Sequence, residues 1–229
     1  MDGVPAELFF GPVFSQDGKR VAVAAKAGSQ IHTYTAFVSG GAPAAAVAGT
    51  SSAFDDAPTW SPDGKWIAFA RIVGNSLKLS KVRPGSGEPA ADLTSIEANP
   101  VPSWSPTGEW IAVYDNHGAL KLVSPDGNSS RPLPGDGGPF AWSRDGKVLY
   151  EVEMNPPALY AVDIATAQRR KLRDLPGLKP YASMNPGLHA SLTSDGADIV
   201  YSVNRPRQEI WILDGIQEPR AWYRRLLGF

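Results

Sequence analysis

The chain of 229 residues contains no cysteine and no excess of charge of one sign. Without cysteine there is no disulfide, no thiolate nucleophile and no cysteine-based metal site. No apolar run approaches the ~20 residues that a membrane-spanning helix requires, so we expect no membrane insertion. The 22 Lys and Arg residues balance 23 Asp and Glu residues, and the formal net charge is −1. Because this balance provides no field that attracts polyanions, we expect no nucleic-acid binding.

The first residues, Met-Asp-Gly-Val-Pro, lack the basic and apolar regions of a signal peptide. We expect that the sequence starts after a removed or unrelated N-terminal part. An extracytoplasmic or periplasmic location is therefore favoured over a cytoplasmic one.

The sequence does contain one motif five times: a short apolar segment, a turn and a β-favouring run. The clearest copy is Trp-Ser-Pro-Asp-Gly-Lys-Trp-Ile-Ala-Phe at 60–69. Proline presets φ at about −65°, Asp bonds its own backbone, and Gly tolerates positive φ. Successive turns are 46, 44, 38 and 50 residues apart, because the turn glycines are Gly18, Gly64, Gly108, Gly146 and Gly196. Such a period is typical of propeller blades and other repeat arrays.

Further strand patterns follow each motif, so each unit is predicted to be a four-stranded antiparallel meander. Proline lies in or beside the first strand of three units, at Pro12, Pro58 and Pro102. Proline is tolerated at a sheet edge, and the innermost strand of a propeller blade is such an edge. The tryptophan after this strand is predicted to pack between neighbouring blades. We therefore predict an all-β propeller with five visible repeats, or alternatively a fragment of a six- or seven-bladed propeller.

One propeller domain is predicted over residues 1–215, with a C-terminal tail over 216–229. The repeats lie near 10–53, 54–97, 98–138, 139–180 and 181–215. The last repeat lacks a fourth strand, and Glu7–Phe10 precedes the first motif. We expect residues 7–10 to complete the last blade, because an open arc leaves apolar faces in water at ~25 cal/mol per Å². A chain whose ring closes is expected to be a monomer.

The repeated Trp-Ser-Pro-Asp-Gly-Lys-x-Ile-Ala-Phe motif resembles the WD-repeat-like propeller repeat of TolB and its relatives. The resemblance covers roughly residues 10–215, with departures at Thr107, Arg144 and Leu192. It implies a TolB-like propeller such as the C-terminal sensor domains of larger bacterial proteins. In that group the propeller often follows a winged-helix or kinase domain. The motif is specific for the fold and uninformative about function.

Most residues that are candidates for chemistry are better interpreted as structural. The turn aspartates Asp17, Asp63, Asp145 and Asp195 fit turn chemistry. The three histidines share no metal-ligand spacing, so we expect no metal and no cofactor; they are His32, His117 and His189. The basic run Arg169-Arg170-Lys171 fits a solvated outer strand, with a patch for an acidic partner as the alternative.

Two groups remain as candidate binding residues. The first lies where inner strands begin, at the predicted channel mouth, and contains Asp55, Asp56, Asn99 and His189. The second is the basic C-terminal tail with Trp222, Arg224 and Arg225, a candidate docking element for a partner. Loops presented by a rigid scaffold commonly carry such binding residues.

We expect a non-enzymatic scaffold that binds a protein partner or senses a small ligand at the channel face. One alternative is a channel-sited, metal-dependent lyase or lactonase, which needs a His or carboxylate cluster in the channel. The other is the substrate-gating propeller of a prolyl-oligopeptidase-type peptidase. The chain contains no Gly-x-Ser-x-Gly nucleophile elbow of its own.

Overall fold

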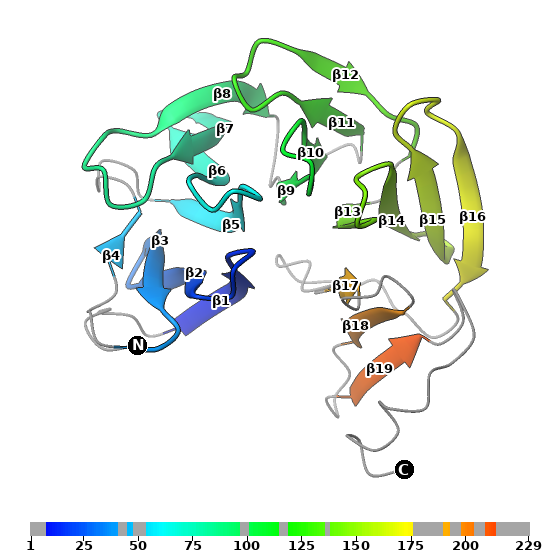
Figure 1. Ribbon diagram of the computed structural model, residues 1–229, viewed down its shortest axis with the longest axis horizontal. Helices are drawn as coiled ribbons and strands as arrows, with labels where there is room; N and C mark the ends of the chain where they lie inside the picture. The colour runs from blue at the N-terminus through cyan, green and yellow to red at the C-terminus, as the bar shows by residue number, and fades with distance from the viewer. Residues whose placement is uncertain are drawn as a thin grey trace.

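Four of the five repeated motifs form the hairpin between the first two strands of an antiparallel sheet in the computed structural model (Figure 1). In each hairpin the glycine N–H donates to the serine carbonyl three residues earlier, at 2.8 to 3.0 Å. The glycine φ lies between 67° and 80°, which glycine adopts without a steric penalty. The structure describes residues 8–40, 45–47, 54–96, 101–114, 119–135, 138–175, 190–192, 198–203 and 209–213, so the fifth motif is covered only in part.

The described strands form five sheets, each built from strands that follow one another in the chain. The first contains β1 (Leu8–Phe14), β2 (Arg20–Ala27), β3 (Gln30–Phe37) and β4 (Ala45–Ala46). The second contains β5 (Asp55–Trp60), β6 (Ile67–Val73), β7 (Ser76–Val82) and β8 (Ala91–Ile96). The third contains β9 (Ser103–Trp104), β10 (Ile111–Tyr114), β11 (Leu120–Val123) and β12 (Ser130–Pro132). The fourth contains β13 (Gly138–Trp142), β14 (Val148–Met154), β15 (Pro157–Asp163) and β16 (Arg169–Asp174). The fifth contains β17 (Ala190–Leu192), β18 (Ile199–Val203) and β19 (Glu209–Leu213).

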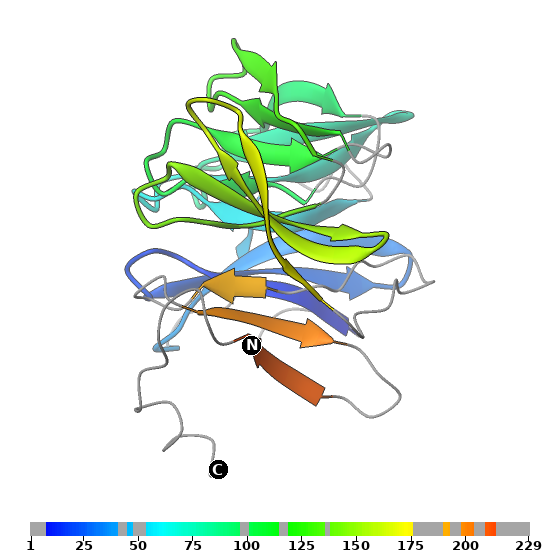
Figure 2. The ribbon, with the colours of Figure 1, turned by 90° about the vertical axis from the view of Figure 1, so that its right-hand side faces the viewer.

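The sheets stand around a common centre, with the first strand of each sheet innermost and the last strand outermost (Figure 1). The side view shows the strands running across the picture, with hairpins at both ends (Figure 2). Among the described residues there is no helix, and hence none of the length and apolarity that a membrane span requires. The prediction of an all-β propeller with antiparallel four-stranded blades is confirmed.

The inner strands tolerate proline because they are edge strands. Pro12 and Pro58 lie in β1 and β5, each of which has only one hydrogen-bonded neighbour strand. Both prolines lie in a bulge, where the register of the pairing shifts. The bulge has positive φ at the preceding residue, 48° at Gly11 and 52° at Ala57.

In the second, third and fourth sheets, a row of three apolar residues packs against the preceding sheet, and we call this row, and its equivalent on the other sheets, the leading row. It begins with the inner-strand tryptophan and continues with the residues opposite it on the next two strands. The leading rows of the second, third and fourth sheets are Trp60–Ile67–Val82, Trp104–Ile111–Val123 and Trp142–Leu149–Val162. All nine side chains are at most 9% exposed and form cores with the sheet before them.

Two tryptophans also bond to the preceding sheet through the indole N–H. Trp60 donates to the Val13 carbonyl at 3.2 Å, and Trp142 donates to the Ser103 carbonyl at 3.2 Å. A buried indole needs such a partner, because an unpaired N–H in the core is costly. The prediction that the tryptophans pack between blades is therefore confirmed.

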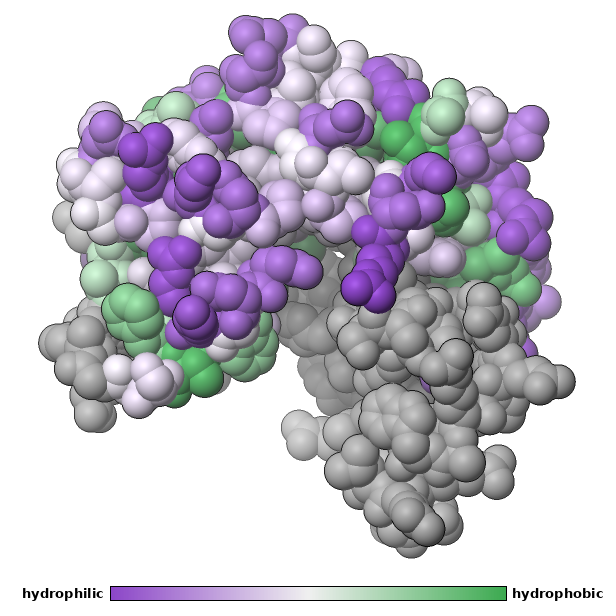
Figure 3. Space-filling view, in the orientation of Figure 1, coloured by the Kyte–Doolittle hydropathy of each residue, from purple (hydrophilic) through white to green (hydrophobic). Residues whose placement is uncertain are grey.

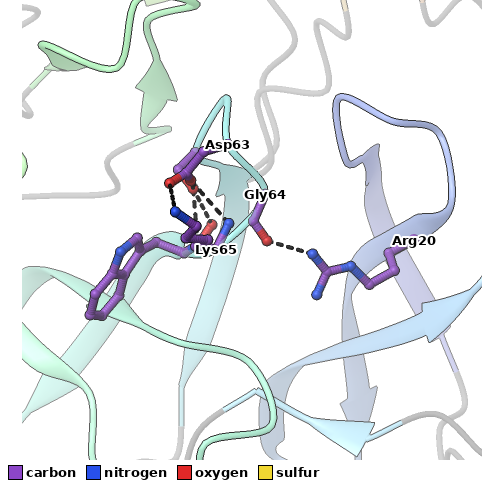
Figure 4. Close-up of polar contacts among 6 residues, drawn as sticks. Arg20, Asp63, Gly64 and Lys65 are labelled. Carbon is purple, nitrogen blue, oxygen red and sulfur yellow. Dashed lines mark hydrogen bonds and ion pairs between the residues drawn. The ribbon is translucent and has the colours of Figure 1, made fainter.

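The hairpin turns of neighbouring sheets also contact one another. Arg20 donates to the Gly64 carbonyl (Figure 4). Its guanidinium also lies over the Trp60 ring. A Cβ added at Gly108 would lie 3.3 Å from Pro62 Cγ of the preceding turn. A Cβ added at Gly146 would lie 2.7 Å from Thr107 Cγ2. Glycine is therefore needed at these turns for two reasons: it adopts the positive φ, and it leaves room for the turn of the neighbouring sheet.

The expected closure of the ring by residues 7–10 is wrong. Leu8–Phe10 pairs with β2, with Leu8 opposite Lys26, and β1 is the inner edge of the first sheet. The reason is the bulge at Gly11-Pro12, which lets residues on both sides of it pair with the same strand; Glu7 lies outside the described residues. Figure 1 shows the first and last sheets at the two ends of an open arc. The described strands thus form an incomplete propeller, in agreement with the alternative of a propeller fragment.

Substitution of the turn glycines should separate backbone strain from contact between sheets. Gly18→Ala meets no atom within 4 Å, so only its φ of 67° is penalised, and we expect a loss of about 1–2 kcal/mol in unfolding free energy. Gly146→Ala has a similar φ and also collides with Thr107, so its loss should be larger by at least about 1 kcal/mol. Urea denaturation of both variants measures the difference.

The double variant G146A/T107S is the control for this comparison. Serine removes the methyl group in the collision and keeps the hydroxyl that contacts Ser105. Its stability should return toward that of G18A. Equal losses for G18A and G146A would contradict the proposed contact between turns.

Candidate functional site

The turn aspartates bond within their own hairpins. Asp17, Asp63 and Asp145 accept a hydrogen bond from the serine two residues earlier, at 2.6, 2.6 and 2.8 Å. Each also accepts the backbone N–H two residues later, at 3.0 or 3.1 Å. These bonds favour the charged carboxylate and lower the pKa of all three groups. Their interpretation as turn residues is confirmed for these positions, and Asp195 lies outside the described residues.

The same hairpin also occurs between β11 and β12. Ser124 donates to Asp126 at 2.5 Å, and Asp126 accepts the Asn128 N–H at 3.0 Å. With the side chain of Asn128 as a third donor, these bonds lower the pKa of Asp126 to about 2. The Asp126 carboxylate is therefore charged and hydrogen-bonded within the turn at any physiological pH.

Asp55 lies buried between the first two sheets and is 3% exposed. The strand register places it opposite Arg71, whose Nε and Nη2 donate to its two carboxylate oxygens at 2.7 and 3.0 Å. From β3 of the first sheet, His32 Nδ1 lies 3.8 Å from Asp55 Oδ2, and Thr33 Oγ1 donates to the Asp55 carbonyl at 3.0 Å. Asp55 therefore links two sheets, and Arg71 occupies both of its oxygens.

Neither Arg71 nor His32 was identified as a partner of Asp55 from the sequence. Arg71 follows the apolar run of the second motif, and its burial to 7% exposure is visible only once the register is known. His32 is 8% exposed, which agrees with its interpretation as a structural residue. A bidentate Arg–carboxylate pair is strong and directional, which suits it to fixing two sheets.

Asp56 has a different environment from Asp55. Its carboxylate accepts the Ala57 N–H at 2.6 Å, and burial raises the pKa of the Asp56 carboxyl. Ala57 itself has a φ of 52°, which a non-glycine residue adopts only at a cost. A carboxyl with a raised pKa beside a strained backbone is a recognised sign of a functional position.

A second buried carboxylate lies in the fourth sheet. Glu151 is 0% exposed, five residues after its turn glycine, where the first three sheets carry Val23, Phe69 and Val113. Arg169 of β16 bonds to Glu151 and, at 2.6 Å, to Glu153. Its guanidinium stacks on the Tyr160 ring at 3.5 Å. This residue of the predicted basic run is therefore part of an internal network, while Arg170 remains exposed.

The first sheet leaves partly open the leading row that the second, third and fourth sheets bury. Its row is Phe14–Val21–Ala36, by the same register. Phe14 is 64% exposed, against 7 to 9% for the tryptophans at the equivalent position. Phe37 and Val38 are each 53% exposed at the end of β3, and Figure 3 shows apolar side chains gathered over this sheet at the lower left. Contiguous exposed apolar surface marks interaction sites more often than isolated apolar residues do.

The remaining predicted site residues cannot be compared with the structure. Asn99, His189, Trp222, Arg224 and Arg225 all lie outside the described residues. The structure does not bring Asp55 and Asp56 together as one ligand set, because Asp55 is paired with Arg71. Within the described ranges, no group of three or more His, Asp or Glu side chains could hold a metal ion.

Neither a protein-family model nor a curated protein matches this sequence. Among solved structures, the chain is similar to TolB from Acinetobacter baumannii, with a TM-score of 0.71 and 18% identity over 90% of this chain and 52% of that one. A putative TolB from Agrobacterium tumefaciens gives a TM-score of 0.70 and 16% identity, over 93% and 79% of the two chains. A puromycin-hydrolyzing peptidase from Mycobacterium tuberculosis gives 0.66 and 14%, over 92% and 37%. The chain thus spans about half of the first of these proteins, and identities this low establish the fold alone.

Breaking the buried Asp55–Arg71 ion pair should lower the free energy of unfolding far more than breaking an exposed ion pair does. Arg71→Met leaves the Asp55 charge buried without its partner, and we expect a loss of about 3–5 kcal/mol in unfolding free energy. Lys65→Met removes an ion pair with Asp63 whose side chains are 72% and 49% exposed, so its loss should stay under about 1 kcal/mol. Chemical denaturation at neutral pH compares the two, and similar losses would contradict a buried pair.

Ionisation of Asp56 should lower the free energy of unfolding, whereas ionisation of Asp63 should raise it. The raised pKa of Asp56 means that the folded state holds its proton more tightly, so unfolding free energy falls as pH rises through the interval above the unfolded value of about 4. Asp56→Asn, whose amide oxygen can still accept the Ala57 N–H, should be more stable than the parent at pH 7. Asp63 has a lowered pKa and contributes stability that is lost as pH falls below that value, so Asp63→Asn should be less stable at pH 7. Denaturation curves between pH 3 and 7 test both signs.

Proposed function

Because the chain has the fold of TolB-like β-propellers, we propose that it is a non-enzymatic module that binds a protein through the first sheet. The single observation that carries this proposal is the 64% exposure of Phe14, which heads the leading row Phe14–Val21–Ala36, whose other two members are half-buried. In the three sheets that follow, the same row is covered by a neighbouring sheet. Leaving a phenylalanine in water where the fold elsewhere buries tryptophan is unfavourable, and a protein partner removes that cost.

The scaffold suits this role because neighbouring sheets are linked at several points. The indole bonds join inner strands, the turns contact one another, and the cluster of His32, Asp55 and Arg71 joins the first sheet to the second. A surface held in this way loses little conformational freedom when it binds. The balanced charge of the chain favours an apolar protein contact over a polyanion.

The channel face remains a second place for a small ligand, and Asp56 supports it better than Asp55. Asp55 has both oxygens bound by Arg71, whereas Asp56 is half-buried with a raised pKa. In this second proposal Asp56 contacts the ligand, together with the predicted residues Asn99 and His189.

The peptidase alternative gains support from the puromycin-hydrolyzing neighbour, of which this chain spans 37%. In that case the propeller would control substrate access to a catalytic site on another part of the polypeptide. The purified chain, incubated with puromycin and with aminoacyl anilides, is expected to release no product. Turnover would favour an enzymatic function over the binding module.

Photo-crosslinking tests the binding function at the proposed surface. A benzoylphenylalanine at position 14 or 38 is expected to form a discrete adduct with a protein in an extract of the source cells. The same probe at Arg170, exposed on the outermost strand β16, is the matched control and should form none. Adducts with another protein or with the chain itself both support the proposal. No adduct at 14 or 38, or an equal yield at 170, would contradict it.

A further inference from the structure

We infer that Lys81 and Arg83, which lie over the ring of Trp66, bind the phosphate group of a phosphate monoester. The site lies on the second sheet, and it goes beyond the proposed function, which concerns Phe14 of the first sheet. Repeated sheets of one chain serve as references for one another. The cations over successive tryptophans differ in what else they bind, and that difference identifies the site.

In two places the cation over a tryptophan also bonds to the following sheet. The Arg20 guanidinium lies 4.6 Å from the centre of the Trp60 ring and donates to the Gly64 carbonyl of the second sheet. The Arg131 guanidinium lies 5.3 Å from the centre of the Trp110 ring and donates to a carbonyl in the turn after β15 of the fourth sheet. Each of these guanidinium groups is therefore used to join two sheets.

Trp66 carries two cations, and neither of them joins sheets in this way. Lys81 Nζ lies 4.7 Å from the centre of the Trp66 ring, and the Arg83 guanidinium carbon lies 4.9 Å from it. Lys81 belongs to β7, and Arg83 directly follows that strand. Over the ranges that the structure describes, neither side chain donates to a carbonyl or pairs with a carboxylate. Their N–H donors therefore remain open to a ligand.

Two cations on one ring are unfavourable without a counter-charge. Attraction to the indole face and burial of an alkyl stem explain a single cation over a tryptophan. One cation lies over Trp60, and one lies over Trp110. A second cation at Trp66 adds repulsion between like charges. An anion that contacts both side chains removes this repulsion.

The charge and shape of the pair favour a phosphate over a carboxylate. Lys81 and Arg83 present two positive charges, whereas a carboxylate carries one negative charge. A phosphate monoester carries about −1.5 to −2 at pH 7 and has three acceptor oxygens. The guanidinium offers a planar fork to two of these oxygens, and the ammonium group offers a compact charge to another.

The loop after Arg83 leaves room for such a ligand. Arg83 is exposed, and a Cβ added at Gly85 or Gly87 would meet no atom within 4 Å. The backbone N–H groups of both glycines have no acceptor in the described part of the chain, so they too can donate to a phosphate oxygen. Glu88 is the carboxylate of this loop, and it forms no ion pair with Lys81 or Arg83.

Calorimetric titration of the whole chain is the first test. The probes are inorganic phosphate, glycerol phosphate, and a phosphoserine peptide with its unphosphorylated form as the control. We expect one phosphate site per chain, and binding that weakens several-fold between about 50 and about 500 mM salt, because exposed charges are screened. Tighter binding of the phosphopeptide than of glycerol phosphate would identify a phosphorylated protein as the source, and the reverse would identify a small phosphate ester. Absence of binding by all three phosphate probes would overturn the inference.

Charge-removing variants separate ligand binding from packing on the ring. The double variant K81M/R83M keeps an apolar side chain over Trp66 and removes both charges. We expect it to bind phosphate at least roughly tenfold more weakly, with a thermal midpoint in phosphate-free buffer equal to or above that of the parent. Arg83→Lys keeps the charge and removes the planar fork, so its loss of affinity should be smaller.

Arg131→Met is the matched control, because Arg131 also lies over a tryptophan but bonds to the following sheet. It should be less stable than the parent and bind phosphate equally well. Unchanged phosphate affinity in the folded K81M/R83M variant would overturn the site, and so would an equal loss of affinity in R131M. Either result leaves the crosslinking test at Phe14 unaffected, because the two surfaces lie on different sheets.

Discussion

The contact between an inner-strand tryptophan and the sheet before it is the interaction on which the architecture depends. It combines burial of a large aromatic ring with a directed bond from the indole to a backbone carbonyl, as at Trp60 and Val13. The ring fixes the distance between sheets, and the bond fixes their relative height. With that contact in place, the turns meet, and Arg20 reaches the Gly64 carbonyl (Figure 4).

Two carboxylates interrupt this otherwise apolar stacking. Asp55 and Glu151 are each at most 3% exposed, and each is bound by an arginine from its own sheet. Buried ion pairs of this kind contribute little net stability compared with apolar residues of the same volume, and their directionality favours one alignment over others. They distinguish the second and fourth sheets of a repetitive chain, in which successive sheets would otherwise be nearly interchangeable.

Local chemistry explains which parts of the structure could be predicted from the sequence. The Ser-x-Asp-Gly turns, the edge position of Pro12 and Pro58, and the burial of the tryptophans all follow from the conformational needs of single residues. The pairing of Asp55 with Arg71 depends on strand register, which shifts at the bulge between Asp56 and Thr59. The wrong prediction that residues 7–10 close the ring also results from strand register, since the bulge at Gly11 and Pro12 keeps Leu8–Phe10 paired with β2. Asp56 is predicted as a ligand residue from its place near the start of an inner strand, and that role stays a prediction, whereas its strained neighbour Ala57 carries no signal in the sequence.

The pairing of consecutive strands in every described sheet has a consequence for how the chain is made. Only short loops must close to build a sheet, so the entropy of loop closure is small and the contact order of each unit is low. A sheet can form soon after its own ~40 residues leave the ribosome, and it then finds the preceding sheet already present to cover its tryptophan.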